Sequence, residues 1–181
     1  MPGTVRRLST HRFHETDRLL FDANVWLFLY SPQYGPNDSR VHIYSAALKK
    51  VLAAHSHIFV DSLVFSEFIN AWARFMYNKL PASIKPKDFK TYRNSPAFRP
   101  VAKGIADACR RILGFATRVD SEFASLNIDA VLSGYEAGKA DFNDHVLAEL
   151  CNRKQLMLVT DDADLKGLTL NILTENRRLL S

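Results

Sequence analysis

The sequence contains few of the residues that build zinc sites or disulfide frameworks. Its 181 residues include two cysteines, Cys109 and Cys151, which are far apart and belong to no CxxC or Cys/His pattern. A zinc site or a disulfide framework is therefore not expected, and the two thiols suit a reducing cytoplasm. No run of about 18 apolar residues occurs, so we expect neither a membrane span nor export, and we predict a cytoplasmic protein.

Glycine and proline are also scarce, with seven residues of each, while 47% of the chain is hydrophobic. This composition excludes a disordered or fibrous protein and fits one globular domain. The net charge of +5 favours a polyanionic partner such as nucleic acid. Many basic proteins bind no nucleic acid, so the charge alone leaves the partner open.

Short apolar strands alternate with amphipathic helices along the chain. The expected strands are 19–21, 57–60, 156–159 and 170–173. The expected helices are 24–30, 40–55, 62–79, 101–115, 128–137 and 142–153. Parallel strands need crossover connections, so this alternation predicts an α/β fold with a central, mostly parallel sheet of about four to five strands flanked by helices.

The domain proper is expected to span residues 19–181. Residues 1–18 are polar and basic and predict a flexible tail. An insertion is expected around residues 79–118, in which 81–100 is rich in Pro, Lys and Ser and predicts an irregular connector with one helical turn near Asp88. Basic and aromatic residues interleave in this connector, which leaves open a solvated loop or a surface that contacts phosphates or stacks bases.

Acidic residues follow two of the expected strands. Asp22 comes directly after the first strand, and Asp161 and Asp162 come one residue after the strand that ends at Val159. In an open α/β sheet the active site lies beyond the carboxyl ends of the strands. These carboxylates are therefore expected at one edge of the sheet.

Three more acids are expected near the same edge. Glu67 lies on the polar face of a helix that begins directly after the second strand, and Asp141 and Asp144 lie three residues apart at the start of another helix. Clustered carboxylates repel one another and take up protons unless a cation neutralises them. Oxygen-only ligands favour Mg²⁺ or Mn²⁺, which can activate water for attack on a phosphodiester.

Four segments of the chain together resemble the ordered acidic motifs of PIN domains. They are Phe21-Asp22-Ala23-Asn24-Val25, Ser66-Glu67, Asp144-His145-Val146-Leu147-Ala148, and Leu158-Val159-Thr160-Asp161-Asp162-Ala163-Asp164-Leu165. The resemblance covers about residues 20–173. Each motif alone is common, whereas four in order, each in the expected strand or helix, are fairly specific.

The resemblance implies a PIN-like nuclease domain that hydrolyses RNA with Mg²⁺ or Mn²⁺. By the match, the catalytic metal ligands would be Asp22, Glu67, Asp144 and Asp162. Asp141 and Asp164 would be supplementary metal ligands, Asn24 would orient Asp22, and Thr160 would lie at the edge of the site. Bacterial members are most often VapC-type toxins of toxin–antitoxin pairs, which implies RNA, a cognate antitoxin protein and a homodimer as partners. This chain is longer than the compact toxins, so an RNA-processing nuclease remains an alternative.

Structural roles are open for the same acids. Asp22 and Asp141 can cap the helices that follow them, Asp144 can favour the helix dipole, and Glu67 can pair with Asn70 or Arg74. In the cluster 161–164 at least one acid is expected to be a turn or cap residue, and Asp162 is the preferred ligand. Asp61 is expected to be a turn residue outside the site.

Other functional classes fit less well. Haloacid-dehalogenase-like phosphatases need a second Asp two residues after the first, where this chain has Asn24. Receiver domains begin with an acid pair that is absent before Asp22. An inactive RNA- or partner-binding module of the same fold is opposed by acids at all four motifs.

Overall fold

A six-stranded sheet forms the centre of the molecule. The structure is a computed structural model and describes residues 3–138 and 140–181. The strand order is β1-β6-β5-β2-β3-β4, and every described pair of neighbouring strands is parallel. The strands are β1 (Val5–Arg7), β2 (Arg18–Phe21), β3 (His57–Val60), β4 (Ala116–Arg118), β5 (Met157–Val159) and β6 (Ile172–Thr174). The expected α/β fold is confirmed, and the sheet has six strands where four to five were expected.

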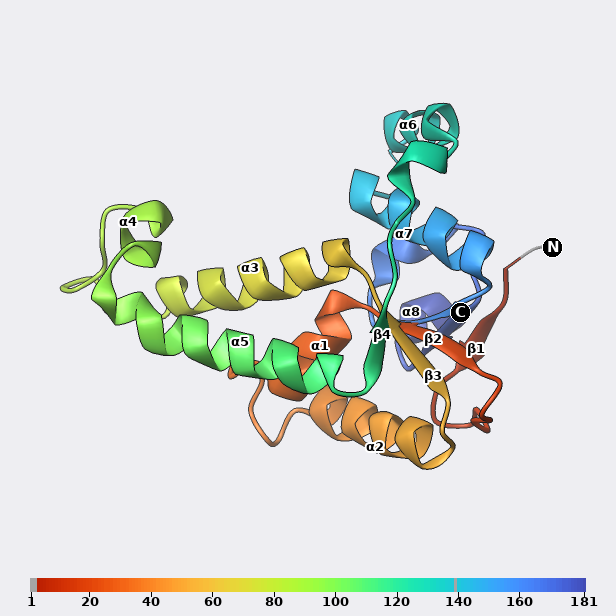
Figure 1. Ribbon diagram of the computed structural model, residues 1–181, viewed down its shortest axis with the longest axis horizontal. Coiled ribbons are helices and arrows are strands. Elements are labelled where there is room, and N and C mark those ends of the chain that lie inside the picture. The colour runs from red at the N-terminus through yellow and green to blue at the C-terminus, as the bar shows by residue number, and fades with distance from the viewer. Residues whose placement is uncertain (1–2, 139) are drawn as a thin grey trace.

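Helices flank the sheet, as Figure 1 shows. They are α1 (Ala23–Tyr30), α2 (Ser39–Ala53), α3 (Ser62–Asn78), α4 (Phe89–Arg93), α5 (Arg99–Leu113), α6 (Ile128–Glu136), α7 (Phe142–Lys154) and α8 (Arg177–Leu180). Three short 3₁₀ turns are η1 (Pro96–Phe98), η2 (Phe123–Ser125) and η3 (Ala163–Leu165). None of the described helices combines the length and the apolar character that a membrane span requires.

The core lies around the central strand β2. Leu19, Leu20 and Phe21 have no exposed surface, because β2 lies between β3 and β5 and both of its faces are covered. Trp26 of α1 stacks on Phe21 with ring centroids 5.0 Å apart. This packing fixes the carboxyl end of β2, where the chain enters Asp22.

Residues 3–18 are more ordered than the flexible tail that the sequence suggested. Val5–Arg7 pairs with β6 as an edge strand, and the side chains of Leu8 and Phe13 are buried. The carboxylate of Glu175 accepts hydrogen bonds from the Ser9 amide and the Arg7 guanidinium. Two buried apolar side chains and a strand pairing therefore hold this segment, while residues 1 and 2 of the expected tail lie outside the described residues.

The expected insertion forms a helical arm. Helices α3 and α5 pack against each other and project from the sheet, with α4 near the far end (Figure 1). The helical turn expected near Asp88 is observed as α4, which Asp88 caps, and the connector expected over 81–100 also contains η1. The rings of Tyr77, Phe89, Tyr92 and Phe98 contact one another at centroid distances of 5.3–5.8 Å, and Tyr92 is buried. These aromatic residues pack the tip of the arm.

Candidate functional site

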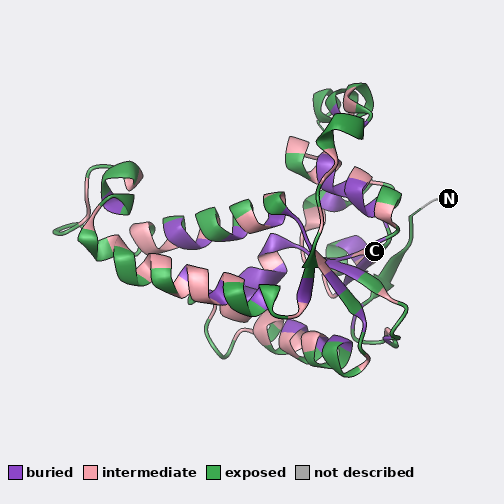
Figure 2. Ribbon diagram, in the orientation of Figure 1, coloured by how far each residue is buried: buried purple, intermediate pink, exposed green. Residues whose placement is uncertain are grey.

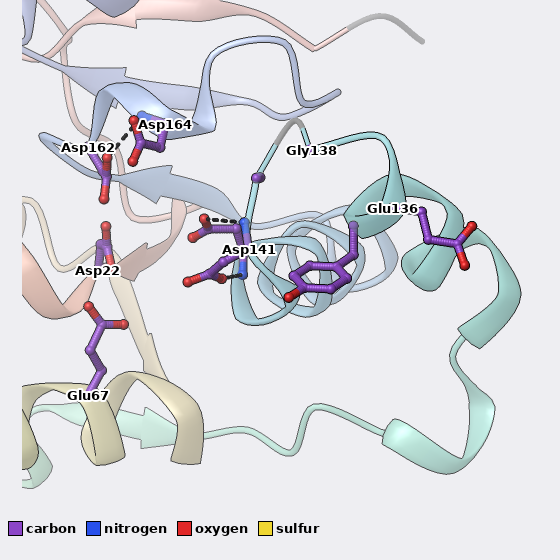
Figure 3. A pocket seen from close by; sticks show the side chains of 10 residues that line it. Asp22, Glu67, Glu136, Gly138, Asp141, Asp162 and Asp164 are labelled. Atoms are coloured by element: carbon purple, nitrogen blue, oxygen red, sulfur yellow. Dashed lines mark hydrogen bonds between the residues drawn. The ribbon is translucent and has the colours of Figure 1, made fainter.

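An acidic pocket of about 780 Å³ opens at the carboxyl ends of the central strands. Seven carboxylate side chains line it, and no lysine, arginine or histidine is among its described lining residues. The acids are Asp22, Glu67, Glu136, Asp141, Asp144, Asp162 and Asp164. The structure therefore brings together all six acids that the sequence singled out as catalytic or metal-binding, and Figure 3 labels all of them except Asp144.

Asp22 lies at the junction of β2 and α1. It is the N-cap of α1, and its Oδ1 accepts a hydrogen bond from the Ala23 amide at 2.6 Å. The residue is only 7% exposed, yet its side chain lines the pocket. Capping and participation in the site are therefore compatible roles for this carboxylate.

Asn24 and Thr160 hold the second oxygen of Asp22. The Asn24 amide donates to Oδ2 at 2.5 Å, and the Thr160 hydroxyl donates to the same oxygen at 2.6 Å. The Asp161 amide donates to Asn24 Oδ1, and the Asp162 amide donates to Thr160 Oγ1. This network ties the end of β2 to the loop after β5 and fixes the direction of the Asp22 carboxylate.

Glu67 reaches the pocket from the second turn of α3. Figure 3 shows its carboxylate pointing toward Asp22. Within the described part of the chain, no hydrogen bond or ion pair joins Glu67 to Asn70 or Arg74. Asn70 donates instead to Ser66, and Arg74 lies over the ring of Phe89. The alternative in which Glu67 forms a surface pair on its own helix is thus not observed.

Asp141 and Asp144 form a capping box at the start of α7. The Asp144 amide donates to the Asp141 carboxylate, and the Asp141 amide donates to the Asp144 carboxylate. Both side chains also line the pocket. The helix start expected from their spacing thus positions two carboxylates at the site.

The acids after β5 face in different directions. Asp162 and Asp164 line the pocket, and Asp162 also caps η3 by accepting from the Asp164 amide. Asp161 accepts a hydrogen bond from the Tyr44 hydroxyl at 3.0 Å and is not among the pocket residues. Asp61, which was expected to stay outside the site, caps α3.

Glu136 is a pocket residue that sequence reasoning missed. It ends α6, and together with Tyr135, Gly138 and Ala140 it forms the outer wall of the pocket. No motif surrounds Glu136 in the sequence, and only the packing of α6 against α7 places it there. Its proximity in sequence to Asp141 was the one available signal.

The pocket raises the pKa of three carboxyl groups. Burial, and to a smaller extent the charge of Asp162, raises the pKa of Asp22 to about 6, against hydrogen bonds that lower it. Partial burial and then the neighbouring acids raise the pKa of Glu67 to about 7 and that of Asp144 to about 6. A cation in the pocket would remove this repulsion and favour the ionised forms.

The donor set fits a hard divalent cation. All the candidate ligands are carboxylate oxygens, which suits Mg²⁺ or Mn²⁺. Within residues 3–138 and 140–181, no three Asp, Glu, His or Cys side chains lie close enough together to form one ligand set. This spacing suits Mg²⁺, which binds through one or two carboxylates and keeps several waters, better than a cation enclosed by protein.

The fold and the acidic edge of the sheet define a PIN-like α/β domain, and two solved structures resemble it. A chain from the crystal structure of VapBC2 from Rickettsia felis, bound to a DNA fragment from their promoter, is 14% identical, with a TM-score of 0.54 over 86% of this chain and 97% of that chain. PAE2754 from Pyrobaculum aerophilum is 17% identical, with a TM-score of 0.50 over 98% of this chain and 96% of that chain.

At these identities the likeness shows the fold alone. No protein-family model matches the sequence, and no curated protein matches it.

Proposed function

We propose that the protein is an endoribonuclease that depends on Mg²⁺ or Mn²⁺. The observation that carries the proposal is the convergence of six acids, from four separate motifs of the chain, in one pocket whose described lining residues include no neutralising side chain. Asp22, Glu67, Asp144 and Asp162 would hold the metal, either directly or through its bound waters, with Asp141 and Asp164 as supplementary ligands. A bound divalent cation would supply an activated water and stabilise the charge that develops on the phosphate.

The residues around Asp22 support this role by fixing a ligand in place. Asn24 and Thr160 donate to one oxygen of Asp22, so its carboxylate keeps one orientation before any cation binds. Ligands held by such outer partners bind metals more tightly than mobile ones. Asn24 and Thr160 are therefore positioning residues in this proposal.

The test is cleavage of RNA by the purified protein with MnCl₂, comparing Asp162→Asn with Asp161→Asn. The two residues are adjacent, but only Asp162 lines the pocket. We expect Asp162→Asn to abolish most cleavage and Asp161→Asn to retain it, since Asp161 bonds to Tyr44. Equal activity in the two variants, or cleavage that persists in EDTA, would contradict the proposal.

We further propose that the nuclease is the toxin of a toxin–antitoxin pair and acts in the cytoplasm. The fold likeness to a VapBC2 chain supports this assignment. Expression of the chain alone should arrest growth, and Asp22→Asn should relieve the arrest. Normal growth together with metal-dependent cleavage in vitro would favour an RNA-processing nuclease, whereas RNA binding without cleavage would favour an inactive module.

A cognate antitoxin and a second copy of the chain are the proposed protein partners. An apolar groove of about 320 Å³ between α3 and α5 supports a protein contact on the arm, and Ile69, Phe98 and Ile105 are among its lining residues. Light scattering of the purified chain would identify a homodimer. A monomer at all concentrations would leave the antitoxin as the only one of these partners.

A further inference from the structure

Among the described residues that line the acidic pocket, none carries the positive charge that attracts nucleic acid. Seven carboxylates and no cationic side chain are among its described lining residues. The affinity of proteins for RNA comes largely from Lys and Arg side chains that contact phosphates. The described part of the surface that could hold an RNA substrate is therefore sought outside the lining of this pocket.

Positive charge is concentrated in the arm, defined here as residues 70–111. This segment contains ten Lys and Arg residues and two Asp residues, which gives it a net charge of +8. The whole chain carries +5, so the remaining residues together carry −3. The basic character of the protein is thus a property of the arm.

The cations at the tip of the arm have no carboxylate partners among the described residues, and all of them are exposed except the half-buried Lys85. Arg74 lies over the ring of Phe89 at 4.9 Å, and Lys85 lies over the ring of Tyr77 at 4.5 Å. Asp88 caps α4 through the Thr91 amide. The other acid of the arm, Asp107, pairs with two cations on α5. None of the described ion pairs involves the cations of the tip, which include Arg74, Lys85, Lys87, Lys90 and Arg93.

Helix α3 connects this charge to the pocket. Glu67 and Arg74 are seven residues apart, so they lie on one face of the helix at a separation of about 10 Å along its axis. Asn70 and Asn78 continue the same polar face, while Phe68 and Trp72 are buried. A backbone that lies along this face would pass from the tip toward the acids.

We propose that the polar face of α3 and the cations of the tip form the RNA-binding surface, which leads the phosphodiester backbone of a single-stranded RNA to the acidic pocket. This inference rests on the proposed nuclease function. A second basic region near Arg6 and Arg12 is a weaker candidate, because Asp17 lies within it and neighbouring Arg7 pairs with Glu175.

The experiment measures binding of a fluorescein-labelled single-stranded RNA by anisotropy in EDTA, so that cleavage does not interfere. The arm variant carries Arg74→Gln, Lys87→Gln, Lys90→Gln and Arg93→Gln. The control variant removes the same charge elsewhere through Lys49→Gln, Lys50→Gln, Arg177→Gln and Arg178→Gln, all at exposed positions. A milder variant, Lys87→Gln/Lys90→Gln, leaves the stacked Arg74 intact if the fourfold variant fails to fold.

We expect the arm variant to bind RNA at least about tenfold more weakly and to lower the slope of log K against log salt by about 3, with the control close to wild type. The inference would be overturned by an equal loss of RNA affinity in the arm and control variants. It would also be overturned if the arm variant kept its RNA affinity while the wild-type protein bound and cleaved RNA. Neither result would contradict the proposed nuclease function. The latter result would assign the arm to an acidic protein partner. If wild type bound no RNA, the inference and the RNA substrate would fail together.

Discussion

The acidic pocket and the basic arm share one helix but are built in opposite ways. In the pocket, carboxylates from four separate parts of the chain converge, and the pKa values of Asp22, Glu67 and Asp144 rise. In the arm, cations from one continuous segment are spread over an exposed surface. Burying several carboxylates close together in the pocket raises the free energy of the folded protein, and a bound metal ion can offset this increase. The charges of the arm stay in contact with water, so they change the free energy of folding little.

If the proposed function holds, catalysis and RNA binding are separated along α3. Glu67 lies at the pocket end of the helix and Arg74 lies on the arm. The account predicts that changes in the pocket alter the chemical step and that changes on the arm alter RNA affinity. Four predictions test this separation.

Asp22→Asn should have the largest effect. It removes the charge of a proposed metal ligand that Asn24 and Thr160 hold in place, so cleavage at saturating RNA should fall by about 10²–10³-fold while RNA affinity changes less than about threefold. Single-turnover cleavage with MnCl₂ measures the first quantity, and anisotropy measures the second. Asp129→Asn, at an exposed position of α6, is the control. If Asp22→Asn lowered the affinity for RNA but not the rate of cleavage, the proposed separation of catalysis from RNA binding would be wrong.

The pH dependence of the metal-free protein follows from the raised pKa values. The unfolded chain loses the protons of these carboxyls near pH 4, whereas the folded protein keeps them up to about pH 6 for Asp22 and Asp144 and about pH 7 for Glu67. Raising the pH through this window therefore lowers the free energy of unfolding. Above about pH 7 these carboxyls are ionised in the folded protein, so a metal ion can bind them without displacing protons.

Mn²⁺ affinity should accordingly increase by about tenfold or more between about pH 5.5 and about pH 8. Titration calorimetry measures the affinity, and the increase in Tm on addition of MnCl₂ should be larger at the higher pH. An affinity that is equal at both values would show that these carboxyls are not the ligands.

Arg74→Gln should have a smaller and different effect. Loss of one phosphate contact should raise KM by about threefold to tenfold and leave kcat unchanged. Glu67→Gln, on the same helix face, should lower kcat instead. Steady-state kinetics of both variants measures kcat and KM separately. A fall in kcat for Arg74→Gln would show that this residue takes part in the chemical step.

Lys103→Gln should have the smallest effect. Asp107 already neutralises Lys103 through a contact of 2.6 Å, although Lys103 is exposed on the arm. We expect RNA affinity to change less than about twofold. A change as large as that of Arg74→Gln would show that total charge, and not the position of unpaired cations, determines binding.

The sequence predicted the central part of the fold better than its edges. Strands β2, β3, β5 and β6 carry apolar runs, and all four were expected close to their observed positions. Strand β1 is exposed along its length, and β4 buries only its first residue, so neither has the apolar pattern of a strand. Both pair at the edges of the sheet, and their conformation depends on contacts with residues distant in sequence.

In the site and the arm, too, the sequence did not predict features that depend on contacts between distant residues. The acids Asp22 and Asp162 were predictable because each follows a recognisable strand at the carboxyl edge. Glu136 was not, since its place depends on how α6 packs against α7. In the segment 81–100 the helical turn expected near Asp88 is α4, but η1 and the packing of a buried Tyr92 among its aromatic neighbours were not expected.

The central claim is that the carboxylates at the edge of the sheet bind a divalent cation. The most direct measurement is an anomalous difference map at the manganese absorption edge from crystals soaked in MnCl₂. The account predicts a peak in the pocket beside Asp22 and Asp162, which disappears in Asp22→Asn. A well-ordered pocket without a manganese peak at millimolar MnCl₂ would contradict it.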